Sequence, residues 1–126
     1  MSRVLDASAV LAYLHQEPGW ETVQSVIGES CISAVNWSEV AQKIKQKGMD
    51  ITTVRCLIEE LGLIIAPFSL EQAELAAHLW DQGKAFGLSL ADRACLALAM
   101  QQQSPVFTAD RVWVKLKLDI DIRLLR

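Results

Sequence analysis

The sequence has little of what characterises disulfide-stabilised, membrane-spanning or generally basic proteins. Its 126 residues include three cysteines, an odd number without CxxC spacing, which argues against a disulfide framework and a zinc site. No stretch approaches the roughly 18 consecutive apolar residues of a membrane span, and Asp6 interrupts any signal-peptide core. The net charge is −3 and the pI is near 5.3, which argues against a general polyanion binder. We therefore expect a cytoplasmic protein that does not span a membrane.

What is present indicates one globular domain over residues 1–126, since 52% of the residues are hydrophobic and 21% are charged. Short apolar segments predict strands over 3–5, 31–35, 63–68, 105–108 and 120–124. Periodic segments predict helices after Asp6, over 20–27, from Asn36 to Gly48, and over 50–61, 69–80, 89–100 and 110–116. Strands that alternate with helices predict an α/β fold of three layers, α/β/α, around a parallel sheet of about four or five strands.

Two finer predictions concern burial. The almost wholly apolar segment 63–68 is typical of a strand that is buried on both faces of a parallel sheet. Helical spacing favours core positions for Trp20, Trp37 and Trp80, whereas Trp113, close to Asp110, is open to either core packing or base stacking.

Four acidic residues lie at matching places relative to the predicted strands. Asp6 follows the first strand, Glu39 lies one turn beyond the second, and Asp110 follows the strand that ends at Thr108. Asp92 lies in the first turn of the helix over 89–100. Because the carboxyl ends of parallel strands share one edge of a sheet, where ligands bind, we expect the four acids to gather there.

Each acid alone is also explained by helix capping. Ser89 to Asp92 fits a capping box, and Asn36 is a typical cap residue. Capping does not explain four carboxylates at one edge, because their mutual repulsion would oppose ionisation. A divalent cation would remove that penalty, and oxygen ligands without His or Cys suit Mg²⁺ or Mn²⁺.

The four segments that contain these acids resemble the ordered motifs of PIN-domain nucleases. They are Val4-Leu5-Asp6-Ala7-Ser8-Ala9, Asn36-Trp37-Ser38-Glu39-Val40, Leu88-Ser89-Leu90-Ala91-Asp92-Arg93-Ala94 and Val106-Phe107-Thr108-Ala109-Asp110-Arg111. Within that family the sequence is most similar to VapC-type toxins. The resemblance implies a Mg²⁺- or Mn²⁺-dependent ribonuclease that forms a homodimer and is blocked by a cognate antitoxin protein.

The resemblance also implies residue roles. Asp6, Glu39, Asp92 and Asp110 would be the catalytic acids, and Asp6, Asp92 and Asp110 would bind the metal. Ser8 and Thr108 would hold a metal-bound water or a phosphate oxygen, with local capping as the alternative. The candidates for RNA phosphate binding are Lys43, Arg93 and Arg111, although a lysine-bearing helix face is typically only solvated.

Alternatives remain open at this point. The acids could all be caps in a non-catalytic PIN-like module that binds RNA or protein. A haloacid-dehalogenase-type phosphatase is disfavoured, because Ser8 stands where that class needs a second acid. Apolar residues in excess of what one sheet face needs predict a partner groove or a dimer face; they are Val10, Leu11, Leu14, Val54, Leu57, Ile58 and Leu61.

Overall fold

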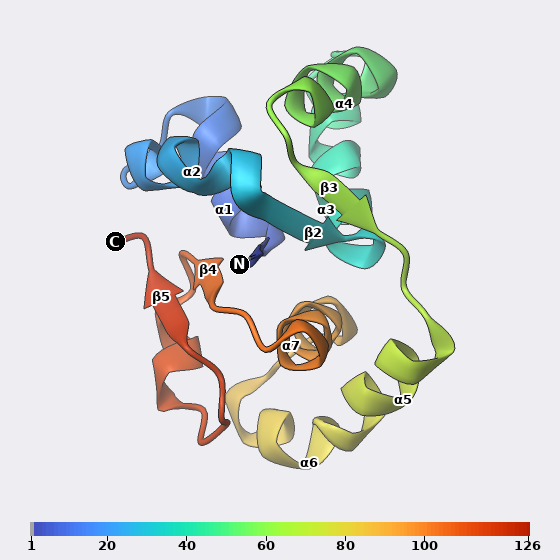
Figure 1. Ribbon diagram of the computed structural model, residues 1–126, viewed down its shortest axis with the longest axis vertical. Helices are drawn as coiled ribbons and strands as arrows, with labels where there is room; N and C mark the ends of the chain where they lie inside the picture. Colours follow the sequence, from blue (N-terminus) through green and yellow to red (C-terminus); the bar gives the residue numbers. More distant parts are fainter. Residues whose placement is uncertain (1) are drawn as a thin grey trace.

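The computed structural model describes residues 2–126 as a five-stranded parallel sheet between two layers of helices (Figure 1). The strands are β1 (Arg3–Leu5), β2 (Ser30–Ser33), β3 (Ile64–Ala66), β4 (Val106–Thr108) and β5 (Ile122–Leu124). The α-helices are α1 (Ala7–His15), α2 (Trp20–Val26), α3 (Ala34–Gln46), α4 (Ile51–Glu60), α5 (Leu70–His78), α6 (Trp80–Gly83) and α7 (Leu90–Gln102). Three 3₁₀ helices complete the chain: η1 (Ile27–Glu29), η2 (Lys84–Phe86) and η3 (Arg111–Lys115). The predicted α/β fold with a parallel sheet is confirmed.

The strand order of the sheet is β3-β2-β1-β4-β5, and all neighbours are parallel. From β1 the chain builds outward through β2 to β3, and it then returns through α7 to place β4 on the other side of β1. The strand order therefore reverses between β1 and β4, which in open α/β sheets is where ligands bind, beyond the carboxyl ends of the strands.

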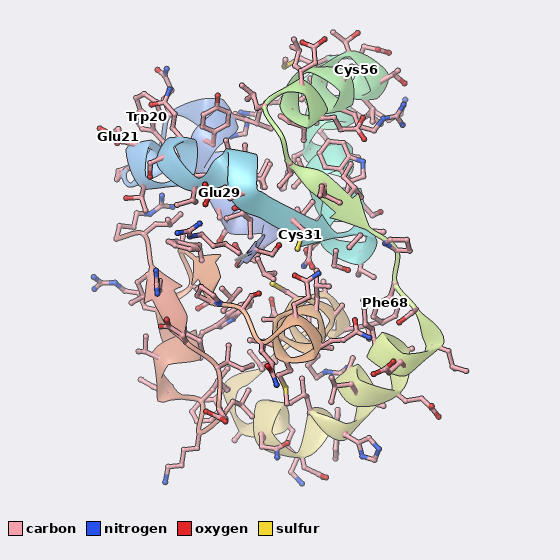
Figure 2. All side chains as sticks on the ribbon, viewed as in Figure 1. Trp20, Glu21, Glu29, Cys31, Cys56 and Phe68 are labelled. Atoms are coloured by element: carbon pink, nitrogen blue, oxygen red, sulfur yellow. The ribbon has the colours of Figure 1, made fainter. Side chains whose placement is uncertain are left out.

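The core lies on both faces of the sheet because side chains alternate along each strand. Val4 faces the layer of α5, α7 and η3, whereas Leu5 faces the layer of α1 to α4. In β2, Cys31 faces the same layer as Val4, and Ile32 faces the same layer as Leu5. Figure 2 shows Cys31 between β2 and α7. Among residues 2–126 no helix is long and apolar enough to cross a bilayer.

The boundary between β2 and α3 differs from the prediction. The strand ends at Ser33, whose side chain accepts a hydrogen bond from the backbone N–H of Val35 and caps α3. The helix therefore begins earlier than the sequence indicated. Asn36, which we expected to be the cap, lies inside the first turn of α3 and is buried.

The burial predictions for segment 63–68 and for Trp80 are wrong. The strand in that segment is β3, which lies at the edge of the sheet, and the side chain of Ile64 is 65% exposed. Trp80 is also half-exposed, and the Lys84 ammonium lies over its indole ring, 4.9 Å from the ring centroid. Trp113 is fully buried in the core, so it has a packing role rather than a base-stacking one.

Candidate active site

Asp6 is the buried centre of the candidate site. It follows β1 directly, caps α1, and its side chain is only 6% exposed. Its Oδ1 accepts hydrogen bonds from Ser8 Oγ (2.7 Å) and from the backbone N–H of Ala9 (2.9 Å), and its Oδ2 accepts one from Thr108 Oγ1 (2.6 Å). The carboxylate is thus fixed in orientation by three donors.

Burial raises the pKa of Asp6 to about 6, because it disfavours the charged form. The three hydrogen bonds oppose this effect, and the negative charge of Asp92 adds to it. Asp6 is therefore a carboxylate whose ionisation is costly near neutral pH. A bound cation would offset that cost.

Two hydroxyl groups connect the ends of β1 and β4, where the strand order reverses. Thr108 Oγ1 donates to Asp6 and accepts the backbone N–H of Asp110 (3.0 Å). Ser8 Oγ donates to Asp6 and accepts the backbone N–H of Ala109 (2.9 Å). The two hydroxyls therefore place Asp6 beside the turn that carries Asp110. These hydrogen bonds are the local role that the sequence offered as one interpretation. Contact of either hydroxyl with a metal-bound water or a phosphate oxygen stays a prediction.

Asp92 and Glu39 reach the same edge from two helices. Asp92 lies in the first turn of α7, where Ser89 and Asp92 form the predicted capping box: the N–H of Ser89 donates to Asp92 Oδ2 (3.0 Å). Glu39 lies on α3, where Asn36 Nδ2 donates to its Oε1 (3.3 Å). Partial burial raises the pKa of Glu39, and the charge of Asp92 contributes to the same shift.

The buried thiol of Cys95 lies within reach of the negative charges of three of these acids. Cys95 lies one turn after Asp92, and its pKa is raised well above the ordinary value by burial and by the negative charges of Asp6, Asp92 and Glu39, among others. Asp110 is more exposed, and its Oδ1 accepts the N–H of Val112 (3.0 Å). Within residues 2–126 no three Asp, Glu, His or Cys side chains are already close enough to hold a metal ion. A shared cation site for the four acids therefore stays a prediction, and their side chains would have to close around the cation.

The three predicted phosphate-binding residues have different surroundings. Lys43 is exposed one turn after Glu39 on α3. Arg111 is exposed next to Asp110, and its Nε donates to the carbonyl of Arg126 (3.1 Å). Arg93 instead donates from NH1 to the carbonyl of Ala76 (2.8 Å), which anchors α7 to α5.

A family model matches the part of the chain that contains these residues. The PIN domain profile matches residues 3–118, which include all four acids. This chain belongs to the PIN domain family. No curated protein sequence matches it.

Solved structures similar to this PIN domain include several toxins. A toxin–antitoxin complex from Klebsiella pneumoniae has a TM-score of 0.79 at 18% identity, with 98% of each chain covered. VapBC2 from Rickettsia felis, bound to a DNA fragment from its promoter, has a TM-score of 0.78 at 13% identity, with 98% of each chain covered. Mycobacterium tuberculosis VapC20, described as a toxin that cleaves the sarcin-ricin loop, has a TM-score of 0.71 at 11% identity, over 96% of this chain and 99% of that one. At these identities the similarity establishes the fold.

The donor chemistry of the site fits a hard divalent cation. A carboxylate offers about four lone-pair positions, and the three donors to Asp6 leave room for one further partner, on the Oδ2 side. The remaining candidate ligands, on Asp92, Asp110 and Glu39, are also carboxylate oxygens, which suit Mg²⁺ or Mn²⁺.

Proposed function

We propose that this PIN domain is a Mg²⁺- or Mn²⁺-dependent endoribonuclease and the toxin of a toxin–antitoxin pair. The observation that carries the proposal is the buried, hydrogen-bonded Asp6 at the reversal of strand order. Burial raises the pKa values of Asp6 and Glu39, and the negative charge of Asp92 adds to both shifts. The solved toxins with the same fold support the cellular role.

In this proposal each acidic residue has a defined task. Asp6 and Asp92 would hold the cation directly, and Asp110 would be a further ligand. Glu39 would hold the cation through a water molecule, the one that attacks the phosphate. Ser8 and Thr108 hold the Asp6 carboxylate in one orientation, so that its free lone pair is directed to the same place in every molecule. When bound, the cation supplies a water of lowered pKa and positive charge at the phosphate in the transition state.

Two of the three basic candidates remain in the proposed contact with RNA. Lys43 shares a helix face with Glu39, since residues four apart lie one above the other, and Arg111 adjoins Asp110. Both side chains are exposed, so a phosphate can reach them. We assign Arg93 a structural role, because its guanidinium is directed to α5.

The proposed activity is tested with purified protein and RNA, with Mn²⁺ and then with EDTA. We expect cleavage that requires Mn²⁺ and that falls by roughly a hundredfold or more in Asp92→Asn, since the cation contributes several kcal/mol to the transition state. Asn at position 92 can still accept the N–H of Ser89, so the capping box and the melting temperature should be nearly unchanged.

Asp50→Asn is the matched control for this experiment. Asp50 is also an acidic helix cap, but it caps α4, which begins beyond the far end of α3 from the site. We expect full activity from this variant. RNA binding without cleavage by the wild-type protein would instead support a non-catalytic module, and equal activity of Asp92→Asn and wild type would remove Asp92 from the site.

We further propose that the antitoxin inserts an apolar segment into a groove between α1, α3 and α4. The groove has a volume of about 540 Å³, and Leu14, Ile44, Val54, Leu57 and Leu61 contribute to its lining. Leu57 is 57% exposed, and Leu61 is 45% exposed. Of the residues predicted for a partner face, Val10, Val54 and Ile58 are buried in the core. Lys47 and His15 at the rim suit a partner segment that also carries acidic residues. The expected homodimer is part of the same proposal.

Leu57→Lys should weaken the complex with the antitoxin by roughly tenfold or more, because it places a charge in an apolar contact. Figure 2 shows side chains of α4 projecting outward, including that of Cys56. The measurement is the affinity between the toxin and the protein encoded by the neighbouring reading frame. Leu70→Lys is the control, because Leu70 is 77% exposed on α5, in the opposite helix layer. Equal affinity of Leu57→Lys and wild type would place the antitoxin elsewhere.

A further inference from the structure

We propose that Asn36 is a positioning residue of the acidic site: its amide group holds Glu39 of α3 against the first turn of α7, directly beside Asp92. This inference rests on the metal-dependent function proposed above. Asn36, which the sequence indicated only as a helix cap, thereby helps to arrange two of the acids.

The contacts of Asn36 fix the orientation of its amide. The side chain is 2% exposed, and Nδ2 donates both to the backbone carbonyl of Ala91 (3.0 Å) and to Glu39 Oε1 (3.3 Å). Both partners are acceptors, so only the NH₂ group can face them. The alternative amide orientation would direct an oxygen at a carbonyl and at a carboxylate.

These two bonds connect the helices that carry the acids. Ala91 directly precedes Asp92 in α7, and Glu39 lies one turn after Asn36 in α3. Partners of metal-binding carboxylates orient them and tune the site. A single amide therefore sets the position of Glu39 relative to Asp92, although the two acids come from segments far apart in the sequence.

Stability alone does not explain this side chain. Its Oδ1 is buried and has no hydrogen-bond partner among residues 2–126. A buried polar atom without a partner costs free energy, which an apolar residue of the same size would avoid while losing both donated bonds. Retaining an amide here is understandable if its two donated bonds arrange the acidic site.

Gln72 provides a matched control within the same molecule. It is also a buried amide, on α5, and its Nε2 donates to Gln101 Oε1 of α7 (2.7 Å). Its carbonyl oxygen likewise lacks a partner within the described part of the chain. Its partner lies near the end of α7, away from the acids, so Gln72→Met removes a comparable buried amide without a link to Glu39.

The test is a double-mutant cycle with the Mn²⁺ dissociation constant, measured by calorimetry, as the readout. Asn36→Leu should weaken Mn²⁺ binding by roughly 10- to 100-fold, the effect typical of removing such a partner. In the Glu39→Ala background the same substitution should have almost no further effect, because its contribution acts through Glu39. Gln72→Met should bind Mn²⁺ as the wild type does. An equal loss in both backgrounds, or no loss in either, would overturn the role of Asn36.

A measurement on the wild-type protein decides the matter even if Asn36→Leu does not fold. In ¹⁵N-labelled protein, the side-chain amide signals of Asn36 should shift on addition of Mg²⁺, whereas those of Gln72 should not. Unshifted Asn36 signals in a protein that binds Mg²⁺ would overturn the inference and leave the proposed function intact. A wild-type protein that binds neither Mg²⁺ nor Mn²⁺ would overturn both.

Discussion

Asp6→Asn should abolish metal-dependent RNA cleavage and, in the absence of metal at pH 8, should raise the melting temperature of the protein. The loss of activity is expected to be roughly a hundredfold or more, because the substitution removes the most buried negative charge of the proposed cation site. The gain in stability follows from the same charge. Asn has almost the same shape, and its oxygen can still accept the hydrogen bonds from Ser8 and Ala9.

The direction of this stability change and the pH range in which it occurs follow from the pKa of Asp6. That pKa is about 6 in the folded protein, whereas its ordinary value is 3.8. Because the folded value is the higher one, this group favours folding most below pH 3.8, and its contribution is lost as the pH rises through 6. At pH 8 the ionised Asp6 costs up to about 3 kcal/mol, and Asn avoids that cost. The difference between variant and wild type should therefore be largest above pH 7 and should shrink towards pH 4.

Thermal unfolding of both proteins between pH 4 and pH 8 measures this difference. Asp50→Asn is the control, because the pKa of Asp50 is shifted in the opposite direction from that of Asp6: hydrogen bonds from Thr53 lower it. That variant should gain no stability at pH 8. If Asp6→Asn were less stable than wild type at pH 8, the buried carboxylate would be a stabilising cap rather than a charge that needs a cation.

The layers of the fold were predictable because they depend on local patterns. Short apolar segments that end at Asp6 and near Asp110 gave β1 and β4 almost to the residue. The position of β3 was not predictable in the same way. Its residues Ile64 to Ala66 are as apolar as a central strand, but strand order decides whether such a segment is buried, and the order places β3 at an edge.

The acidic site was predictable to the extent that it depends on strand ends. The sequence indicated that Asp6, Glu39, Asp92 and Asp110 would gather at one edge. The charges of Asp6, Asp92 and Glu39 all act on the buried thiol of Cys95, whereas a common cation site for the four acids stays a prediction. Partners that come from packing between helices were missed. Asn36 lies three residues before Glu39, which is a usable signal, but its second partner, Ala91, is 55 residues away. The bond of Arg93 to Ala76 likewise depends on how α5 packs against α7.

Mn²⁺ should raise the melting temperature of the wild-type protein by roughly 10 °C when its concentration is about 100 times the dissociation constant. A ligand that binds only the folded state at this concentration adds about 2.7 kcal/mol, and 1 kcal/mol moves the melting temperature of a domain of this size by about 4 °C. The physical reason is that the cation offsets the cost of ionising Asp6, whose pKa is raised by burial and, to a lesser extent, by the charge of Asp92.

The same stabilisation should depend on pH in one direction. Below about pH 6 the Asp6 carboxyl is protonated in the folded protein, so Mn²⁺ must displace a proton to bind. Affinity should then fall by about tenfold for each unit below pH 6 and stay nearly constant above it. At a Mn²⁺ concentration of about 100 times the dissociation constant at pH 8, thermal scans with Mn²⁺ and with EDTA should therefore differ by roughly 10 °C at pH 8 and by only about half as much at pH 5. Asp6→Asn should show no Mn²⁺ effect at either pH, and an equal rise in that variant would place the bound cation away from Asp6.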